Sequence, residues 1–360
     1  MAALRPWSPQ IYTDVVRAYG NHSVREVDRV KRNLFGLSDD DKAELIWKPE
    51  DQVGKMKDAV CANLAFLAKL SEAIQKAPAL QGGDAPTGVK PVQTLLQTLT
   101  REWSAEGAEE RRECFERLLG ALDSHLQAKA EEAATAGTAR PRVLCPGASL
   151  GRLAFEVQQR GYESVGCEAR VLNYFTCEFI RQQGATPEAH RIQPYALSTC
   201  NRFRREDHIR PTPVPDVAIE GSAFPQVRFG DFTRLYDEAT ERGAFDAVLT
   251  AFAVDSSPNI FRFVRTVAHV LRPGGVWANF GPLAYDTDHD EGHGHGVELS
   301  WEELRHAVSH FFDVKEEDFV DAFDAANAES MMQIQYNCVF FKAVRNSTPA
   351  VGIGGTPAAS

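Results

Sequence analysis

The spacing of apolar residues divides the chain into a helical first part and a second part in which strands and helices alternate. Through residues 9–77, apolar residues recur every three or four positions with charged residues between them, which is typical of amphipathic helices. The same spacing returns after a Pro- and Gly-rich stretch at 77–91, which we expect to be an exposed loop. We therefore predict an N-terminal helical region over residues 1–135.

Short apolar runs alternate with helical stretches from residue 142 onward, a pattern typical of a parallel sheet covered on both faces. The runs that read as strands are RVLCP, SVGCEA, QVRFGDF, FDAVLTAFAV, GGVWANFG, FDVKEEDF and YNCVFFKAV. No long helix separates the last two, so we expect them to pair antiparallel at the sheet edge. The pattern predicts an α/β domain over residues 141–345 with a Rossmann-like sheet of seven mostly parallel strands.

Two further stretches depart from this alternation. Residues 185–224 precede the third strand and are too long for a simple turn, so we expect an insertion that contributes to the functional site. The tail at 346–360 is rich in small and polar residues and is expected to be disordered.

Composition restricts the classes of function. With 360 residues, 43% hydrophobic and 25% charged, the chain can form one large globular domain or two smaller ones. A net charge of -11 argues against a general nucleic-acid binder, which needs clustered Lys and Arg. Seven scattered cysteines without a CxxC pair indicate reduced thiols in the cytoplasm or nucleus. We find no export signal and no run approaching the roughly 20 apolar residues of a membrane span.

The segment VLCPGASLGRLAFEV, residues 143–157, joins a strand to a helix through a turn of small residues. In a doubly wound sheet this turn faces the ligand crevice. A dinucleotide fingerprint anchored at Gly147 would need glycine where the chain has Ser149 and Arg152. The turn, together with Glu168 at the end of the next strand, instead resembles the nucleoside-binding loop of class I S-adenosylmethionine-dependent methyltransferases.

Three more features occur in the order expected of that fold. Glu168 can accept hydrogen bonds from both ribose hydroxyls, although without a ligand it is an ordinary charged residue at a strand end. Asp231 and Phe232 end the third strand, where the carboxylate can accept from an adenine amine and the ring can pack on the base. The LRPGG turn then introduces the fifth strand.

Longer motifs narrow the resemblance to one family. These motifs are PGASLGRLAFE, PYALSTCNRFRREDHIRP, GDF, the stretch from Ala253 to Ile260, LRPGGVWANFGPLAY and SMMQIQYNCVFF. Together they resemble the carnosine N-methyltransferase family, also called N2227-like proteins, from the N-terminal helices to about Arg345. The resemblance implies an S-adenosylmethionine-dependent enzyme with a class I methyltransferase sheet and added N-terminal helices. Its expected substrate is carnosine or a related histidine-containing dipeptide, methylated on an imidazole nitrogen.

The resemblance also implies the residues of the site. Those implied to contact the methyl donor are Arg101, Gly147, Glu168, Asp231 and Phe232. Those implied to contact the substrate are Asp255 and Tyr336.

Three positions depart from the family pattern. Ser149 replaces a glycine, a small change that the donor site should tolerate. Asp286 stands where the family usually has a histidine that touches substrate, and Ile334 stands where a tyrosine is expected. The resemblance therefore specifies the methyl donor better than the methyl acceptor.

The chemistry of methyl transfer gives Asp255 a specific role. A neutral imidazole is already a competent nucleophile, provided that its other nitrogen keeps the proton. A carboxylate after the fourth strand can accept that N–H and stabilise the imidazolium that forms. The same residue can alternatively cap the helix predicted to begin a few positions later. Tyr336 can orient a substrate amide or carboxylate, or simply lie half-buried at the start of its strand.

Two charged segments have competing interpretations. The dense basic run, Arg202, Arg204, Arg205 and Arg210, is either a solvated helix face or an anchor for a substrate carboxylate. The segment DTDHDEGHGHG at 286–296 contains metal-ligand residue types, but its glycines give it no fixed face. Because methyl transfer from a sulfonium needs no Lewis acid, we predict no metal and a mobile loop over the site.

Two other functions stay open at this stage. One is a methyltransferase of a protein histidine or of another small-molecule acceptor, which the departures at Asp286 and Ile334 allow. The other is a nucleoside-binding protein without catalysis, which the combination of Glu168, Asp231 and Asp255 disfavours. For partners we expect a small-molecule substrate, no nucleic acid and no membrane.

Overall fold

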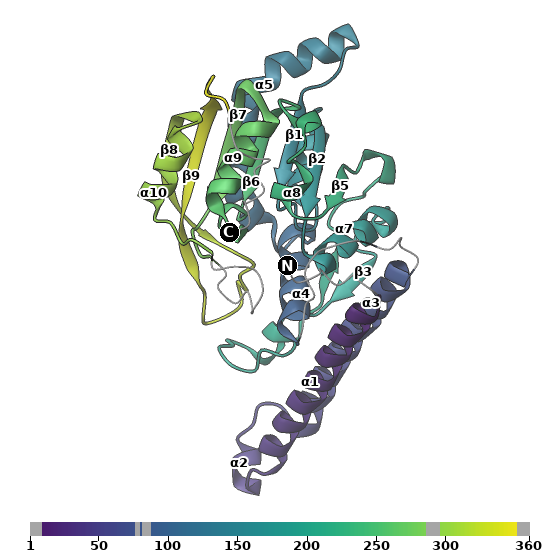
Figure 1. The fold of residues 1–360 in the computed structure, drawn as a ribbon. Helices are drawn as coiled ribbons and strands as arrows, with labels where there is room; N and C mark the ends of the chain where they lie inside the picture. Colours follow the sequence, from purple (N-terminus) through teal and green to yellow (C-terminus); the bar gives the residue numbers. More distant parts are fainter. Residues whose placement is uncertain (1–8, 76–79, 81–87, 286–295, 351–360) are drawn as a thin grey trace, which may run out of the picture.

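The computed structural model describes residues 9–75, 80, 88–285 and 296–350. Figure 1 shows a long helical hairpin that projects from a layered α/β body, in which helices cover both faces of a central sheet. Of the segments predicted from the sequence, residues 286–295, most of the 77–91 loop and the last ten residues of the tail lie outside the described parts of the chain.

The first part of the chain is helical, as predicted. Its helices are α1 Pro9–Phe35, α2 Asp39–Ala43, α3 Pro49–Gln75, α4 Lys90–Trp103 and α5 Ala108–Ala136. The two long helices α1 and α3 lie side by side as the arms of the hairpin, and α2 lies at its tip (Figure 1). Ser38 caps α2 by accepting a hydrogen bond from the Asp41 N–H, which starts the helix after the turn.

The central sheet has seven strands in the order β5-β2-β1-β6-β7-β9-β8. The strands are β1 Arg142–Pro146, β2 Glu163–Glu168, β5 Gln226–Phe229, β6 Phe245–Ala251, β7 Leu271–Gly281, β8 Phe312–Phe323 and β9 Gln335–Arg345. The neighbouring pairs among β1, β2, β5, β6 and β7 are parallel, and only β9 runs antiparallel, between β7 and β8. The predicted mostly parallel sheet is confirmed, and so is the antiparallel pair at its edge.

Alternating residues of the strands face two different helix layers, because successive side chains of a strand point to opposite faces. Val143 and Cys145 pack with α5 and with α6 Arg152–Gln159. Leu144 faces the opposite side of the sheet and packs with a second layer of helices. Those helices are α8 Phe232–Leu235, α9 Ile260–Val270 and α10 Trp301–Ser309. Both faces of the sheet are therefore buried, as parallel strands require.

The third parallel strand is shorter than predicted. The sequence suggested a strand through Asp231 and Phe232, whereas β5 ends at Phe229 and Phe232 begins α8. Gly230, with φ of 136°, turns the chain, and Asp231 then caps the helix by accepting from the Arg234 N–H. The chain therefore starts a capped helix at this position instead of continuing the strand.

The insertion at 185–224 forms a small second sheet. Its strands are β3 His190–Ile192 and β4 Thr212–Val214, which follow α7 Val171–Gln183 and pair antiparallel. Asn63 of α3, fully buried, donates to the Gln193 carbonyl oxygen and accepts from the Gln193 N–H, both at 2.8 Å. The insertion therefore fastens the helical hairpin to the α/β body.

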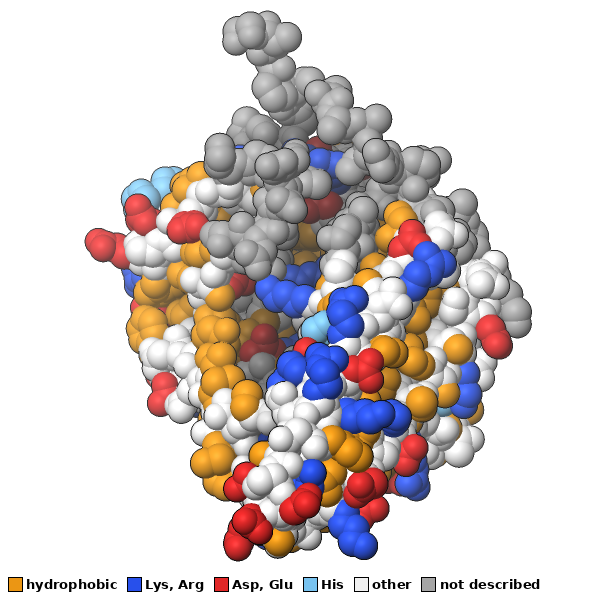
Figure 2. All heavy atoms as spheres, turned by 90° about the horizontal axis from the view of Figure 1, so that it is seen from below, with side chains coloured by type: hydrophobic (Ala, Val, Ile, Leu, Met, Phe, Trp, Pro, Cys, Tyr) orange, Lys and Arg blue, Asp and Glu red, His pale blue; other side chains and the backbone are white. Residues whose placement is uncertain are grey.

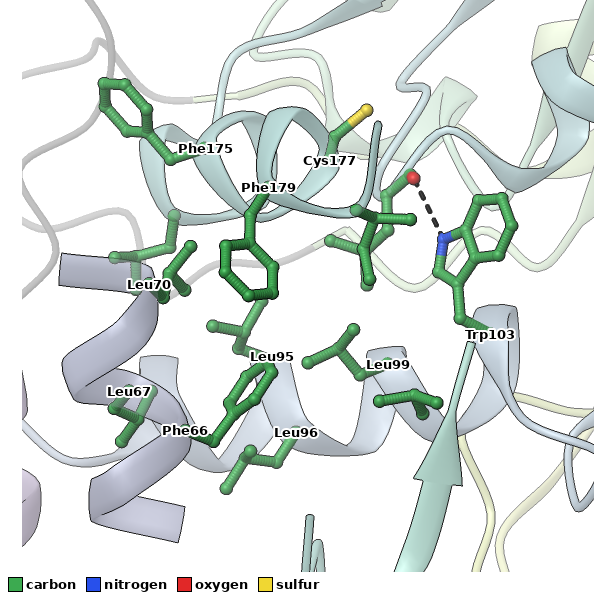
Figure 3. Packing of buried hydrophobic residues seen from close by; sticks show 14 of the residues in the cluster. Phe66, Leu67, Leu70, Leu95, Leu96, Leu99, Trp103, Phe175, Cys177 and Phe179 are labelled. Carbon is green, nitrogen blue, oxygen red and sulfur yellow. Dashed lines mark hydrogen bonds between the residues drawn. The ribbon is translucent and has the colours of Figure 1, made fainter. Parts of the chain in front are cut away.

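One hydrophobic core joins the N-terminal helices to the sheet layer. Figure 3 shows side chains of α3 and α4 packed beneath those of α7, among them Leu67, Leu99 and Phe179, all buried. At the end of α4, the Trp103 indole N–H donates to the Leu150 carbonyl oxygen at 3.0 Å (Figure 3). This contact connects the helical region directly to the turn after β1. The division into a helical region at 1–135 and an α/β domain at 141–345 stays a prediction.

Across the described ranges, none of the helices is both long enough and apolar enough to cross a bilayer.

Candidate functional site

A cleft lies at the carboxyl ends of β1 and β6, the position at which open α/β sheets bind their ligands. Its lining residues are Arg101, Glu102, Phe115, Cys145, Pro146, Gly147, Ala148, Ser149, Leu153 and Ala251. Figure 2 looks onto this edge of the sheet and shows a hollow with acidic side chains inside it and basic side chains gathered beside it. The site is therefore built by α4, α5, β1, β6, the turn after β1 and the start of α6.

The turn between β1 and α6 requires small residues. Gly147 has φ of 66°, and a Cβ atom there would lie 2.7 Å from the Cβ of Ala253. Gly151 has φ of 86°, and a Cβ atom there would lie 2.8 Å from the Phe224 ring and 2.9 Å from the Cys177 sulfur. Ser149, at the position where the family's glycine was expected, also adopts a left-handed conformation with φ of 52°. A residue with a side chain pays roughly 1–2 kcal/mol for that conformation.

Glu168 binds the turn from the end of β2. Its carboxylate accepts from the Ser149 N–H at 2.8 Å and from the Arg170 N–H at 2.6 Å, and the residue is only 6% exposed. A carboxylate offers about four acceptor positions, so holding the turn is compatible with accepting from a ribose. The predicted role of Glu168 in binding the methyl donor is consistent with this geometry and stays a prediction.

Asp231 and Phe232 lie at the start of α8. The Asp231 carboxylate accepts from the Thr233 hydroxyl at 2.6 Å and from the Arg234 N–H at 3.1 Å. The Phe232 ring packs in the core, 4.9 Å from the ring of Phe263 between centroids. The predicted contact of Phe232 with the methyl donor stays a prediction.

Arg101 lies in the last turn of α4 and lines the cleft. Its guanidinium pairs with Asp324, which follows β8, and with Glu102 at 3.2 Å. Burial alone would lower the pKa of Arg101, but the charges of Asp324 and Glu102 outweigh it and raise the pKa above its ordinary value. Arg101 is therefore a permanent positive charge in a cleft that otherwise contains carboxylates.

Three acidic residues that shape the cleft could not be recognised from the sequence. Glu102 is 2% exposed and accepts from the Leu150 N–H at 3.1 Å and the Arg152 N–H at 3.3 Å. Asp324 pairs with Arg101. The third is Glu110 of α5, which binds the loop after β8. No sequence motif distinguishes these residues, because each one matters through a contact with a distant segment.

Glu110 holds the loop that follows β8. Its carboxylate accepts from the Ala325 N–H at 2.6 Å and from the Ala326 N–H at 3.2 Å. Burial raises the pKa of Glu110, although the neighbouring charge of Arg101 opposes the change. The corner between α4 and α5 thus fixes the far wall of the cleft as well as the turn after β1.

Asp255 follows β6 in a short 3-10 turn, η4 Val254–Ser256. Its carboxylate accepts from the Ala284 N–H at 2.8 Å. Burial raises the pKa of Asp255, and backbone N–H donors such as that of Ala284 moderate the change. The alternative role as a helix cap is wrong, because Asn259 caps α9 by accepting from the Arg262 N–H.

Tyr336 lies near the start of β9, opposite Ala322 of β8, and is half-buried against the core. Burial raises the pKa of the Cys338 thiol, two residues along the same strand, and the charges of Asp324 and Asp255 raise it further. The structure brings Arg101 and the turn after β1 together at the cleft, with Glu168 bound to that turn.

The other predicted positions lie at the edge of the site or outside the description. Ile334 is exposed in the loop before β9. Asp286, with most of the His- and Asp-rich segment, lies outside the described residues. In the ranges that are described, no group of three or more His, Cys, Asp or Glu is arranged to hold a metal ion.

The basic run does not form a regular helix face. Arg202 makes an isolated β-bridge with Ser330, and Arg205 begins a single 3-10 turn. Arg210 pairs with Glu106 and donates to the Asn327 side chain at 2.9 Å. Toward other described residues, the guanidinium groups of Arg202 and Arg205 form no ion pair, and burial lowers the pKa of both.

The family model and the curated relatives that match this chain carry the same description, carnosine N-methyltransferase. A family model described as carnosine N-methyltransferase matches residues 82–347. The carnosine N-methyltransferase of Dictyostelium discoideum is 32% identical over 267 residues, which are 71% of this chain and 54% of that protein. The chain thus spans about half the length of that relative. The carnosine N-methyltransferase of Rattus norvegicus is 27% identical over 342 residues, covering 90% of this chain and 82% of the relative.

Among solved structures, a SAM-dependent methyltransferase from Methanosarcina mazei is 12% identical. The match covers 57% of this chain and 93% of that one, with a TM-score of 0.37. The fold assignment therefore rests on the strand order of the sheet and not on this similarity.

Proposed function

The chain belongs to the carnosine N-methyltransferase family, and from this premise we propose that it methylates an imidazole nitrogen of carnosine or of a related histidine-containing dipeptide. The methyl donor is S-adenosylmethionine. The observation that carries the proposal is the link from Glu168 to the Ser149 N–H, beside Arg101, at the carboxyl ends of the parallel strands.

The residues of the cleft fit a sulfonium nucleoside. Glu168 is a buried acceptor suited to ribose hydroxyls, and Arg101 is a cation suited to the carboxylate of the donor's amino acid. The glycine turn lets a ligand approach the backbone at Gly147. When bound, S-adenosylmethionine supplies a methyl group that a nucleophile can displace directly.

Asp255 supports the nucleophile in this proposal. Its carboxylate accepts the N–H of the substrate imidazole, which leaves the lone pair on the other nitrogen for the reaction. The negative charge also stabilises the imidazolium as it forms, so the interaction strengthens toward the transition state. The raised pKa of Asp255 makes it a stronger hydrogen-bond acceptor once it is ionised.

A dipeptide substrate also carries a carboxylate, for which Arg202 and Arg205 are candidate partners. Their guanidinium groups have no ion pair within the described chain, and their segment bridges Ser330 just before β9. Tyr336, at the start of that strand, completes the proposed acceptor side. The cysteine composition supports a cytoplasmic location, with the nucleus as a second compartment, as part of the same proposal.

A different acceptor is the alternative that one observation favours. Ile334 stands where the family pattern has a tyrosine and is exposed together with Met331 and Met332. An exposed apolar segment of this kind, just before β9, suits a bulkier acceptor, such as another small molecule or a histidine in a protein.

An acceptor panel tests the proposal. The purified chain is incubated with methyl-labelled S-adenosylmethionine and, separately, with carnosine, free histidine, related dipeptides and a cell lysate. We expect label in carnosine or a related dipeptide. Label in lysate proteins alone would support the alternative acceptor, and donor binding without transfer to any acceptor would support a non-catalytic protein.

A further inference from the structure

The turn after β1 has no backbone N–H to offer between Ala148 and Arg152. The Ala148 N–H donates to the Cys167 carbonyl oxygen at 2.8 Å, and the Gly151 N–H donates back to the Ala148 carbonyl oxygen at 2.7 Å. The Ser149 N–H donates to Glu168. Phosphate-binding turns use these same N–H groups, together with the start of the following helix, to hold an anion. Here they are already occupied by the protein.

The N–H groups nearest the start of α6 are occupied by Glu102. One oxygen of its carboxylate accepts from the Leu150 N–H at 3.1 Å and from the Arg152 N–H at 3.3 Å. The Arg152 N–H is one of the donors that a helix leaves without internal partners, and the Leu150 N–H lies just before the N-cap residue Gly151; this end of the helix favours a negative charge. Glu102 therefore supplies, from α4, the anion that a phosphate would supply in a nucleotide-binding fold.

Several contacts fix Glu102 in this position. The Arg152 guanidinium donates to the Glu102 carbonyl oxygen at 3.1 Å and pairs with Asp216 at 2.5 Å. The next residue of α4, Trp103, binds the Leu150 carbonyl oxygen. Because these contacts come from the backbone and side chains on both sides, the carboxylate is held against the turn without a ligand.

We propose that Glu102 is a specificity-determining residue, which fills the anion position at the start of α6 so that the cleft accepts an adenosine without phosphates and rejects adenine nucleotides. The inference rests on the proposed function only for the identity of the accepted ligand. A diphosphate at this position would meet the carboxylates of Glu102 and Glu168 without a free N–H to neutralise it. A sulfonium carries the opposite charge and is favoured by the same carboxylates.

Two ligands test the proposal, because they share adenosine and differ in the group attached to it. S-adenosylhomocysteine carries an amino acid linked through a thioether, whereas ADP carries a diphosphate. Calorimetric titration gives both dissociation constants for the wild-type chain, Glu102→Ala, Glu102→Gln and the control Glu156→Gln. Glu156 also binds the Arg152 side chain, at 2.8 Å, but does not touch the turn.

We expect the wild-type chain to bind S-adenosylhomocysteine and to give no measurable heat with ADP. Glu102→Ala frees the Leu150 and Arg152 N–H groups and should gain ADP binding, which changes the ratio of the two constants by at least about tenfold even if the affinity for S-adenosylhomocysteine stays the same. Glu102→Gln keeps the shape of the side chain and should shift the ratio in the same direction by less. Glu156→Gln should match the wild type with both ligands.

The outcomes separate this inference from the proposed function. ADP binding by the wild-type chain, or an unchanged ratio in both Glu102 variants, would overturn the inference. Failure of the wild type to bind S-adenosylhomocysteine would instead count against the proposed function, and a gain of ADP binding in Glu102→Ala would still support the inference. If thermal unfolding shows that Glu102→Ala is not folded, Glu102→Gln alone decides.

Discussion

Carboxylates in this cleft hold backbone from several parts of the chain. Glu102 and Glu168 bind the turn after β1, Glu110 binds the loop after β8, and Asp255 binds the segment after β7. Hydrogen bonds to a charged acceptor are stronger than neutral ones, which helps to offset the cost of burying like charges near one another. The residues that build the walls are therefore the same residues that set the charge of the site.

Glu168→Ala should weaken donor binding. The variant removes the proposed ribose acceptor and the bond that holds the Ser149 N–H, so we expect the dissociation constant for S-adenosylhomocysteine to rise at least about tenfold. The measurement is the ligand-induced shift in melting temperature over a concentration series. Glu163→Ala, at the exposed beginning of the same strand, is the control and should behave as wild type. Equal shifts in the two variants would rule out the assigned role.

Asp255→Asn should separate binding from turnover. The asparagine keeps an oxygen to accept from the Ala284 N–H but loses the charge that stabilises the imidazolium, so kcat should fall by about a hundredfold or more while donor affinity is retained. The measurement combines steady-state kinetics with S-adenosylhomocysteine titration. A parallel loss of both quantities would mean that Asp255 is structural.

The same substitution should not destabilise the fold at neutral pH. The folded-state pKa of Asp255 is raised above its unfolded value, so its contribution to stability is present at low pH and is lost as pH rises through the folded pKa. Removing the ionised group should therefore leave the melting temperature at pH 7 unchanged or higher. A clear decrease at pH 7 would contradict the burial effect.

Activity should depend on two protonations at low pH. The substrate imidazole, with an ordinary pKa of about 6.5, must be neutral to react, and Asp255 must be ionised to accept its N–H. As pH falls below both values, the slope of log kcat/KM against pH should approach about two for the wild type and about one for the residual activity of Asp255→Asn. The same slope for both proteins would show that the carboxylate does not titrate in catalysis.

At the scale of residues, the sequence found the positions that belong to local motifs. The positions of Gly147, Glu168 and Asp255 could be predicted, because each ends or follows a strand of the parallel sheet. Glu102 and Asp324 could not, because their importance comes from partners 48 and 223 residues away in the sequence. The packing of the Phe232 ring against Phe263 could not be predicted either, because it depends on the position of α9.

At the scale of elements, α4 connects the core to the site. Its apolar face, with Leu95 and Leu99, packs in the cluster shared with α3 and α7, and its last turn carries Arg101 and Glu102 to the cleft (Figure 3). The sequence predicted that α4 is a helix but not which elements it packs against, since periodicity identifies an apolar face and not its partner. The strand β3 was not predicted, and the residue after it, Gln193, binds the buried Asn63 of α3, a contact that no local pattern indicates.

Leu99→Ala should destabilise the chain as a whole. The side chain is fully buried at the centre of the shared core, so its truncation should cost about 2–5 kcal/mol of unfolding free energy. Thr94→Ala, on the exposed side of the same helix, is the control and should stay within about 0.5 kcal/mol of wild type. The measurement is urea unfolding followed by circular dichroism.

Because the helices and the sheet share this core, we expect one unfolding transition that moves as a unit in Leu99→Ala. Two transitions, of which the substitution shifts only the first, would show that the helical region folds independently of the sheet.

At the scale of the whole molecule, the parallel strands place Gly147, Glu168, Asp231 and Asp255 at their carboxyl ends, along one edge of the sheet. The alternation of strands and helices was enough to predict the parallel sheet and its antiparallel edge, because a crossover helix requires parallel neighbours and a short connection allows an antiparallel pair. It did not predict how the insertion attaches the helical hairpin, since that contact joins segments 130 residues apart.

The position of the transferred methyl group tests the central claim most directly. The purified chain is incubated with S-adenosylmethionine, isotope-labelled in its methyl group, and with carnosine, and the product is examined by two-dimensional NMR. The account predicts a labelled methyl group on an imidazole nitrogen, formed about a hundredfold or more slowly when Asp255→Asn replaces the wild type. Label on the dipeptide's amine or carboxylate, or no labelled dipeptide while the chain binds the donor, would contradict it.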